Sequence, residues 1–329
     1  MQVILPVAGL GTRLRPQTWS RPKPLVSVAG RTLIDHVLDR LAVLNLERVA
    51  FVTGYLGEQI EAHVRKHYDF DCVFVTQKEQ LGQSHAILQA RDVISGPVVV
   101  LFPDMIFEAD LTEAERSDAD GILWVREVED PSRFGVVVKD GERVVKLVEK
   151  PEEPISNLAV MGIYYFRDSE RLMEVIQRQI SDDRVTKGEY FLADAIQMMI
   201  DEGATFTTSE ASVWQDAGTN EALLETNRYL LDRANASASA DESVIVPPAL
   251  IDPTARVRRS IIGPYVSIGP NAEVVGSIVS DSIIDTGAHV MSVSIEHSII
   301  GRDALIRGSH ERVNLGDNSE LDRRYRGDD

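Results

Sequence analysis

A group of glycines and basic residues near the amino terminus is the part of the chain best suited to bind phosphate. Gly9 and Gly11 follow an apolar run of strand length. Glycines at the end of a strand let backbone N–H groups approach an anion without interference from a Cβ atom. The basic residues Arg13 and Lys23 come next, and the first acidic residue of the chain is Asp35. A protein of net charge -18 therefore begins with a cationic stretch, which predicts a phosphorylated ligand.

The two common glycine-rich phosphate motifs do not match this segment. A dinucleotide fingerprint requires a third glycine where Leu14 stands, and a P-loop requires Gly-Lys after four spacer residues. The segment contains instead Gly-x-Gly-Thr-Arg at 9–13 and Pro-Lys-Pro at 22–24, directly after the first predicted strand. With these two motifs the chain resembles the sugar-1-phosphate nucleotidyltransferases. It is most similar to the long-form glucose-1-phosphate thymidylyltransferases and their uridylyl relatives.

The resemblance implies that a nucleotidyl group passes from a pyrimidine nucleoside triphosphate to a sugar-1-phosphate, with release of pyrophosphate. It favours dTTP and glucose-1-phosphate, while UTP stays open as the alternative. The second pKa of a phosphate monoester is about 6, so the attacking phosphate is already ionised at neutral pH and needs no general base. Such a site has to supply positive charge, backbone N–H donors and Mg²⁺.

The family resemblance assigns roles to the residues of the amino-terminal segment. Arg13 is expected to bind the triphosphate and the leaving pyrophosphate, and Lys23 the α-phosphoryl group and the sugar phosphate. Gln77 aligns with a glutamine that binds the pyrimidine edge, since an amide can donate to and accept from a thymine or uracil imide. For Gln80 and Gln83, a polar surface turn that opens a helix stays open as the alternative. The implied nucleotide-binding residues are Ala8, Gly9, Gly11, Thr12, Gln77 and Gly82.

Two aspartates are candidate Mg²⁺ ligands, because Mg²⁺ is usually held by one or two carboxylates together with substrate phosphates. Asp104 follows a buried run and is expected at the carboxyl end of a strand, where α/β proteins bind ligands. Asp216 stands just before a helix and resembles the family's second metal aspartate. An aspartate in either position is more often a helix cap than a ligand. The motif Pro103-Asp104-Met105 also departs from the Gly-Asp-Asn that many relatives carry.

A sugar-phosphate site is implied by several short segments in the middle of the chain. Glu149 can accept hydrogen bonds from sugar hydroxyls and Lys150 can bind the phosphate, although a solvated lysine after a strand is the alternative for Lys150. Gly135 and Gly162 permit close packing on a sugar ring, and 160–164 resembles the strand beneath the pocket. The implied residues are Gly135, Glu149, Lys150, Val160, Gly162, Tyr164 and Glu189.

Strand and helix patterns alternate along residues 1–232 and must position these side chains. Apolar residues recur with helical spacing over 33–44, and 48–54 predicts a buried strand. The alternation predicts an α/β fold, a Rossmann-like and mostly parallel sheet with helices on both faces. Further strands are expected at 72–76, 98–102, 121–128, 135–138, 144–148 and 161–166, and helices at 58–67, 84–93, 169–179, 191–201 and 220–232.

The pattern changes after a linker of small residues at 233–243. Aliphatic residues followed by small or acidic ones, such as Ile262-Gly263 and Ile284-Asp285, then recur with a hexapeptide period. This period predicts a parallel β-helix over 244–312. The resemblance implies a left-handed one of about four coils of roughly 18 residues each. A charged tail is expected at 313–329.

The length of the chain, 329 residues, predicts two domains. Its composition also argues against several other classes of function. The acidic balance argues against nucleic-acid and membrane partners, and the single cysteine excludes an internal disulfide. With no predicted signal peptide or membrane span, we expect a cytoplasmic enzyme. Open strand edges of the β-helix predict a homo-oligomer. The alternatives left open are acyl transfer by the repeats, through His289, His297 or His310, and a non-catalytic scaffold.

Overall fold

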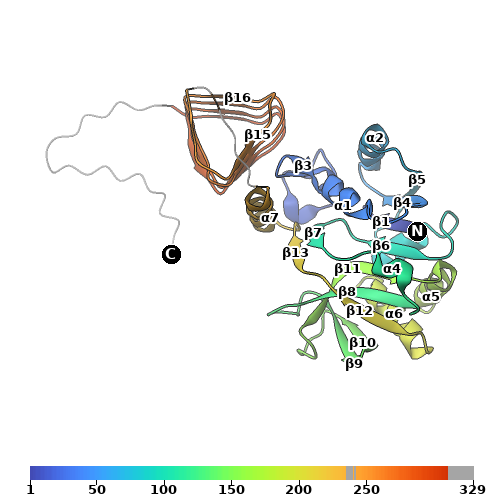
Figure 1. Ribbon diagram of the computed structural model, residues 1–329. Coiled ribbons are helices and arrows are strands. Elements are labelled where there is room, and N and C mark those ends of the chain that lie inside the picture. The colour runs from blue at the N-terminus through green and yellow to red at the C-terminus, as the bar shows by residue number, and fades with distance from the viewer. Residues whose placement is uncertain (235–239, 241, 310–329) are drawn as a thin grey trace. The chain divides into compact units, whose positions relative to one another are not determined.

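The chain folds into two compact units, Met1–Ala236 and Ser237–Asp329, in the computed structural model. The structure describes residues 1–234, 240 and 242–309 (Figure 1). The predicted linker at 233–243 lies partly outside these residues, and the predicted tail at 313–329 lies wholly outside them. These predicted limits stay predictions.

A nine-stranded sheet forms the centre of the first unit, in the order β5-β4-β1-β6-β11-β8-β12-β10-β9. Strands β5, β4, β1 and β6 are parallel, as predicted. Strand β11 runs antiparallel to both β6 and β8, and β10 runs antiparallel to both β12 and β9, so the sheet as a whole is mixed. The strands are β1 Gln2–Pro6, β4 Arg48–Thr53, β5 Cys72–Thr76, β6 Val98–Leu101, β8 Gly121–Glu127, β9 Gly135–Asp140, β10 Arg143–Glu149, β11 Leu158–Phe166 and β12 Phe206–Glu210.

The order of elements explains why the run of adjacent parallel strands stops at β6. Parallel neighbours need a crossover of a dozen or more residues, usually a helix. Helices stand between the strands of the first half, but in the described chain none stands between β8 and β11. Strands joined by short loops there pair antiparallel. The prediction of a mostly parallel sheet therefore holds for the half that ends at β6, and in the other half β8 and β12 form the one further parallel pair among the described strands.

Helices cover both faces of the sheet, as predicted. Helices α3 Gln83–Leu88, α5 Ser169–Ser181 and α6 Leu192–Asp201 share one apolar cluster with Ile4 of β1. Helices α1 Leu33–Leu41 and α2 Gly57–His67 share a second cluster with Val3 and Leu5. Successive residues of β1 thus point to opposite faces and are buried on both. The remaining elements are β2 Ser27–Val28, β3 Arg31–Thr32, β7 Met105–Glu108, α4 Glu113–Arg116, β13 Val213–Asp216 and α7 Asn220–Arg233.

The second unit is a parallel β-helix, as predicted, with three four-stranded sheets over its described residues. Figure 1 shows these sheets as the flat walls of a coil. Val244 pairs with Ile261 and Ile261 with Ile278, a spacing of 17 residues, and Ile278 pairs with Ser294, a spacing of 16. The coils are therefore shorter than the expected 18 residues, while their number, four, agrees. The left-handed sense stays a prediction.

The strands of the β-helix are short because each coil turns at three corners. Inward-pointing residues such as Val257, Val274 and Val290 stack in register and are buried. The strands are β14 Val244–Ile245, β15 Ala249–Ile251, β16 Arg256–Arg258, β17 Ile261–Ile262, β18 Val266–Ile268, β19 Glu273–Val275, β20 Ile278–Ser280, β21 Ser282–Ile284, β22 His289–Met291, β23 Ser294–Glu296, β24 Ile299–Ile300 and β25 Leu305–Arg307.

None of the helices in the described part of the chain combines the length and the apolar character needed to cross a membrane.

Candidate functional site

Two adjoining cavities of about 430 and 480 Å³ open in the first unit where strands β1 and β6 end. We call the one that contains the turn at 9–13 the turn cavity, and the one lined by 160–164 of β11 the β11 cavity. They share four lining residues, so they form one cleft with two halves. The shared residues are Arg13, Gln83, Phe102 and Asp104.

The cleft brings the predicted site residues together from distant parts of the sequence. The turn cavity is lined by all six predicted nucleotide-binding residues, by Lys23 and by Glu189. The β11 cavity is lined by Asp216 and by every predicted sugar-phosphate residue except Glu189. Glu189 was expected with the sugar residues, and the structure places it in the other half.

The turn at 9–13 depends on a glycine in the left-handed region. Gly11 has φ +61° and precedes a short 3₁₀ helix, Thr12–Leu14. A Cβ atom at Gly11 would lie only 3.0 Å from Cβ of Lys23 and 3.1 Å from Cγ2 of Thr18. The Thr18 hydroxyl donates to the Gly11 carbonyl at 2.7 Å. This close packing sets Lys23 against the turn, so the two sequence motifs form one wall.

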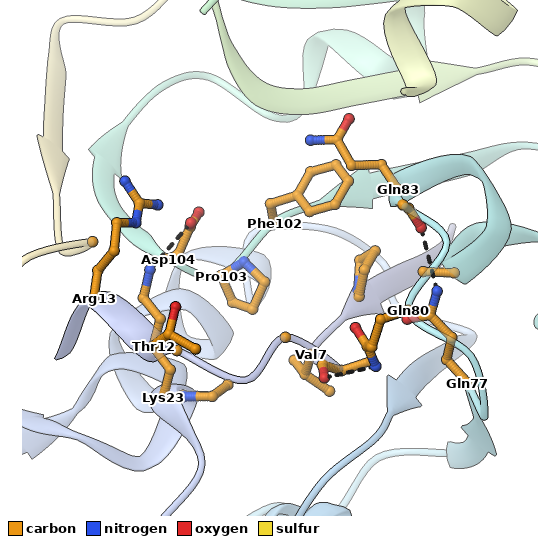
Figure 2. A pocket seen from close by; sticks show the side chains of 18 of the residues that line it. Val7, Thr12, Arg13, Lys23, Gln77, Gln80, Gln83, Phe102, Pro103 and Asp104 are labelled. Atoms are coloured by element: carbon orange, nitrogen blue, oxygen red, sulfur yellow. Dashed lines mark hydrogen bonds and ion pairs between the residues drawn. The ribbon is translucent and has the colours of Figure 1, made fainter. Parts of the chain in front are cut away.

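Basic and acidic side chains meet where the two cavities join. Nζ of Lys23 lies 3.2 Å from Oδ2 of Asp104, and the Lys23 side chain is mostly buried. Nη2 of Arg13 lies 3.4 Å from the position that a Cβ atom would take at Gly218. The Gly218 amide in turn donates to Oδ1 of Asp216 at 2.8 Å. Figure 2 shows Arg13, Lys23 and Asp104 at the same end of the turn cavity.

The two predicted metal ligands lie on paired strands or directly beside them. Asp216 of β13 stands opposite Met105 of β7, and the amide of Ala217 donates to the Asp104 carbonyl at 3.0 Å. Two carboxylates beside a cleft that is lined by basic side chains fit Mg²⁺, which takes its other oxygen ligands from phosphates and water. The described residues contain no group of three or more His, Cys, Asp or Glu side chains that would hold a metal ion without such help.

The far end of the turn cavity holds the residues predicted to bind a base. Gln77 is buried, and its Nε2 donates to the Gly82 carbonyl at 3.3 Å and contacts Nδ1 of His85 at 3.1 Å. Gly82 has φ +115°, and a Cβ atom there would lie 2.6 Å from the backbone nitrogen of Tyr190. Gln80 and Gln83 also line the cavity. Gln83 is half-buried, whereas Gln80 is exposed, so the surface-turn alternative stays open for Gln80.

The β11 cavity contains a pair of oppositely charged residues, Glu149 and Lys150. Nζ of Lys150 lies 3.7 Å from Oε1 of Glu149, and Nζ of Lys187 donates to the Lys150 carbonyl at 2.9 Å. Burial raises the pKa of Glu149, and the charge of Lys150 opposes this shift. Burial also raises the pKa of Asp194, whose Oδ2 atom is buried without a hydrogen-bond partner among the described residues. Lys150 therefore lines the cavity with a side chain that is still 37% exposed.

An irregular stretch of β11 forms the floor of this cavity. The pairing of β11 with β8 shifts between Val160 and Tyr164, and Gly162 has φ +82°. A Cβ atom at Gly162 would lie 3.0 Å from Cε of Met105. Met105 thus fills the space that the glycine leaves. Burial raises the pKa of Tyr164, whose ring completes the floor.

Several wall residues were not among the predicted site residues. Phe102 and Pro103 line the turn cavity, and Phe134 and Trp214 line the β11 cavity with ring centroids 4.6 Å apart. Each of these four residues stands within two positions of a predicted site residue. This proximity in sequence was the one feature that could have indicated that they line the cleft.

The sequence model of the family described as Nucleotidyl transferase matches residues 1–233. The chain belongs to the nucleotidyl transferase family. This match confirms the predicted family, the sugar-1-phosphate nucleotidyltransferases, and it spans all but the last described residue of the first unit.

Two curated relatives align with this nucleotidyl transferase over different lengths. A glucose-1-phosphate thymidylyltransferase of Streptomyces antibioticus is 29% identical over 358 residues, 98% of this chain and 99% of the relative. The bifunctional protein GlmU of Methanocaldococcus jannaschii is 34% identical over 254 residues, 76% of this chain. The chain spans 60% of the length of that GlmU protein.

A solved structure of a UDP-glucose pyrophosphorylase complexed with UDP-glucose has the same fold as the first unit. The TM-score is 0.60 at 23% sequence identity, with 70% of this chain and 98% of that chain covered. The mixed sheet is therefore shared with a protein of known structure.

Proposed function

We propose that the protein transfers the nucleotidyl group of a pyrimidine nucleoside triphosphate to a sugar-1-phosphate in a reaction that depends on Mg²⁺. The favoured substrates are dTTP and glucose-1-phosphate, since a relative named glucose-1-phosphate thymidylyltransferase aligns with 98% of the chain. One observation supports the proposal above all others: Arg13 and Asp104 line both halves of the cleft, and Lys23 contacts Asp104.

The reaction brings two polyanions together, so electrostatic repulsion is the main obstacle. In the proposed complex, the triphosphate lies along the turn at 9–13 and the sugar phosphate lies in the β11 cavity near Lys150. A phosphate oxygen of the sugar forms a bond to the α-phosphorus in line with the leaving group. The bond from the α-phosphorus to the bridging oxygen breaks, and pyrophosphate leaves with that electron pair.

Protein side chains supply charge and position in this scheme, and no general base takes part. Arg13 neutralises the leaving pyrophosphate. Lys23, paired with Asp104 when the cleft is empty, turns its ammonium group to the α-phosphoryl oxygens. Glu149 accepts hydrogen bonds from sugar hydroxyls as a carboxylate. Asp104 and Asp216 are the residues that would hold Mg²⁺, which when bound neutralises phosphate charge.

Pyrophosphate release from a panel of substrates tests this function. We expect release with dTTP and glucose-1-phosphate in the presence of Mg²⁺, and little with ATP or GTP. UTP belongs in the panel as the alternative nucleotide. Absence of release with every pyrimidine triphosphate and sugar phosphate would contradict the proposal. Release of free coenzyme A from acetyl-coenzyme A would support the alternative of acyl transfer by the β-helix.

Self-association and a cytoplasmic location stay predictions. The homo-oligomer prediction depends on the exposed strand edges at an end of the β-helix. Such edges have unpaired backbone groups, which another protein surface can cover. Sedimentation velocity of the full chain tests it, and a monomer at micromolar concentration would contradict it.

A further inference from the structure

The middle of the turn cavity is apolar, whereas both of its ends are polar. Figure 2 shows Pro103 and Phe102 between one end, with Arg13 and Lys23, and the other end, with Gln77. Pro103 is buried and Phe102 half-buried. Any ligand that reaches from one polar end to the other therefore passes an apolar wall.

The part of a nucleoside triphosphate that lies between base and phosphates is the pentose. With the phosphates at the turn and the base near Gln77, the pentose lies beside Pro103. We propose that Pro103, together with Phe102, makes the cavity select 2′-deoxyribose over ribose. This inference rests on the proposed nucleotidyl transfer and names the sugar of its nucleotide.

The backbone of this wall offers a hydroxyl group no free N–H donor at Phe102 or Pro103. Proline has no N–H to donate, and the amide of Phe102 already donates to the Gly162 carbonyl at 3.0 Å. Strand β6 ends at Leu101 and β7 begins at Met105, so Pro103 lies in the connection, where no sheet hydrogen bond is lost. Any other residue at this position would add one N–H donor to the wall.

The glutamines of the cavity are partly engaged as well. Nε2 of Gln80 donates to the Ala8 carbonyl at 3.2 Å, and Nε2 of Gln77 donates to the Gly82 carbonyl. Oε1 of Gln83 accepts from the amide of Leu192 at 3.3 Å. A 2′-hydroxyl at the wall would lose water and would find no backbone N–H donor at Phe102 or Pro103 in its place. An apolar site rejects an added hydroxyl by up to about a hundredfold.

Four triphosphates separate the effect of the hydroxyl from that of the thymine methyl group: dTTP, dUTP, 5-methyluridine triphosphate and UTP. With glucose-1-phosphate as acceptor, we expect kcat/KM to favour each deoxynucleotide over its ribose counterpart by about tenfold to a hundredfold. The ratio should be the same for thymine and uracil. Pro103→Ala and Pro103→Ser, which restore an N–H donor, should reduce the preference to about threefold or less.

Two variants serve as controls for these ratios. Phe102→Leu keeps the wall apolar and should retain the preference. Pro6→Ala removes a different proline that lines the same cavity and should also retain it. Each ratio compares two substrates with the same preparation of one variant. A lower fraction of active protein therefore affects both kcat/KM values equally and cancels in the ratio.

Equal use of matched deoxy and ribo substrates by the wild-type chain would overturn the inference, and so would an unchanged ratio in the Pro103 variants. The wild-type comparison of dTTP with 5-methyluridine triphosphate decides the matter if the Pro103 variants do not fold. Pyrophosphate release without a deoxyribose preference would overturn this inference and leave the proposed function standing. Absence of release with all four would contradict both.

Discussion

The first unit and the β-helix bury their apolar side chains in different ways. In the first unit a sheet lies between two separate clusters, with Ile4 in one and Leu5 in the other. In the β-helix a single core, with residues such as Val274 and Val290, runs inside the coil. Each coil packs on its neighbours alone, so the same contacts repeat from coil to coil.

The charged contacts of the two regions differ in the same way. Lys23 and Asp104 are 81 positions apart in the chain, and Asp216 joins them from a third segment. In the β-helix, by contrast, Glu273 contacts His289 and Asp281 contacts His297, both at a separation of 16 residues. The cleft of the first unit therefore brings together charged side chains from separate segments, in an arrangement that occurs once. A catalytic site requires such an arrangement. Regular stacking of coils favours a structural role.

Removal of Lys23 should produce the largest functional loss and sharpen this contrast. In Lys23→Ala, we expect kcat to fall about 100- to 1000-fold, because one fixed cation at the reacting group is lost. Affinity for the triphosphate should change less, since Arg13 and the turn remain. Steady-state kinetics with pyrophosphate detection measures both. Lys66→Ala on α2 is the matched control, because Lys66 is exposed. Full turnover in Lys23→Ala would exclude Lys23 from the mechanism.

A cavity in the β-helix core should affect stability without affecting chemistry. Ile284 is almost completely buried, and in Ile284→Ala we expect the free energy of unfolding of the β-helix to fall by about 3 kcal/mol. The kcat of the folded protein should stay unchanged. Calorimetry and kinetics on the same sample test both parts. In Ile278→Ala, where the side chain is half-exposed, the loss should be small. A large fall in kcat for Ile284→Ala would break the contrast between the two regions.

A paired glycine experiment tests the base end of the turn cavity. At Gly82 a Cβ atom would collide with Tyr190, whereas at Gly96 none of the described residues lies within 4 Å, and both glycines have positive φ. Strain in Gly82→Ala should raise KM for the triphosphate about tenfold. Gly96→Ala should cost about 1 kcal/mol of stability and leave KM unchanged. Equal KM values in the two variants would remove Gly82 from nucleotide binding.

The smallest effect is expected from a buried carboxylate between α1 and α2. Asp35 accepts hydrogen bonds from Nε2 of His63 at 2.7 Å, from the Tyr68 hydroxyl at 2.9 Å and from the Thr32 hydroxyl at 2.6 Å. Burial opposes ionisation of Asp35, but the hydrogen bonds from His63 and Thr32 outweigh it and hold the pKa of this carboxyl well below its usual range.

Because the folded-state pKa of Asp35 lies below its unfolded value, ionised Asp35 stabilises the fold above the ordinary aspartate pKa of about 3.9. This stabilisation is lost as the pH falls below that value. Asp35→Asn should therefore be less stable at pH 7, by about 1–2 kcal/mol, and should lose less on acidification. Denaturant unfolding at several pH values measures the slope. A slope equal to that of the wild type would show that Asp35 makes no such contribution.

The sequence predicted those features that depend on local spacing. Gly11 and Lys23 stand in motifs whose order alone indicated a phosphate site, and the hexapeptide period indicated the β-helix. Pairing of β11 with β6 was not predicted, because it depends on contacts between segments about 60 residues apart. Pro103 and Trp214 were not predicted as wall residues for the same reason, since tertiary packing decides which neighbours of an aspartate face the cleft.

The central claim is that two phosphate esters meet in one cleft and that the nucleotidyl group passes directly between them. The configuration at the α-phosphorus tests it most directly, with one stereoisomer of dTTP that carries sulfur at this atom and glucose-1-phosphate as acceptor. A single in-line displacement predicts inversion of configuration in the nucleotide sugar. Retention would show two successive displacements through a nucleotidyl-enzyme and would contradict direct transfer.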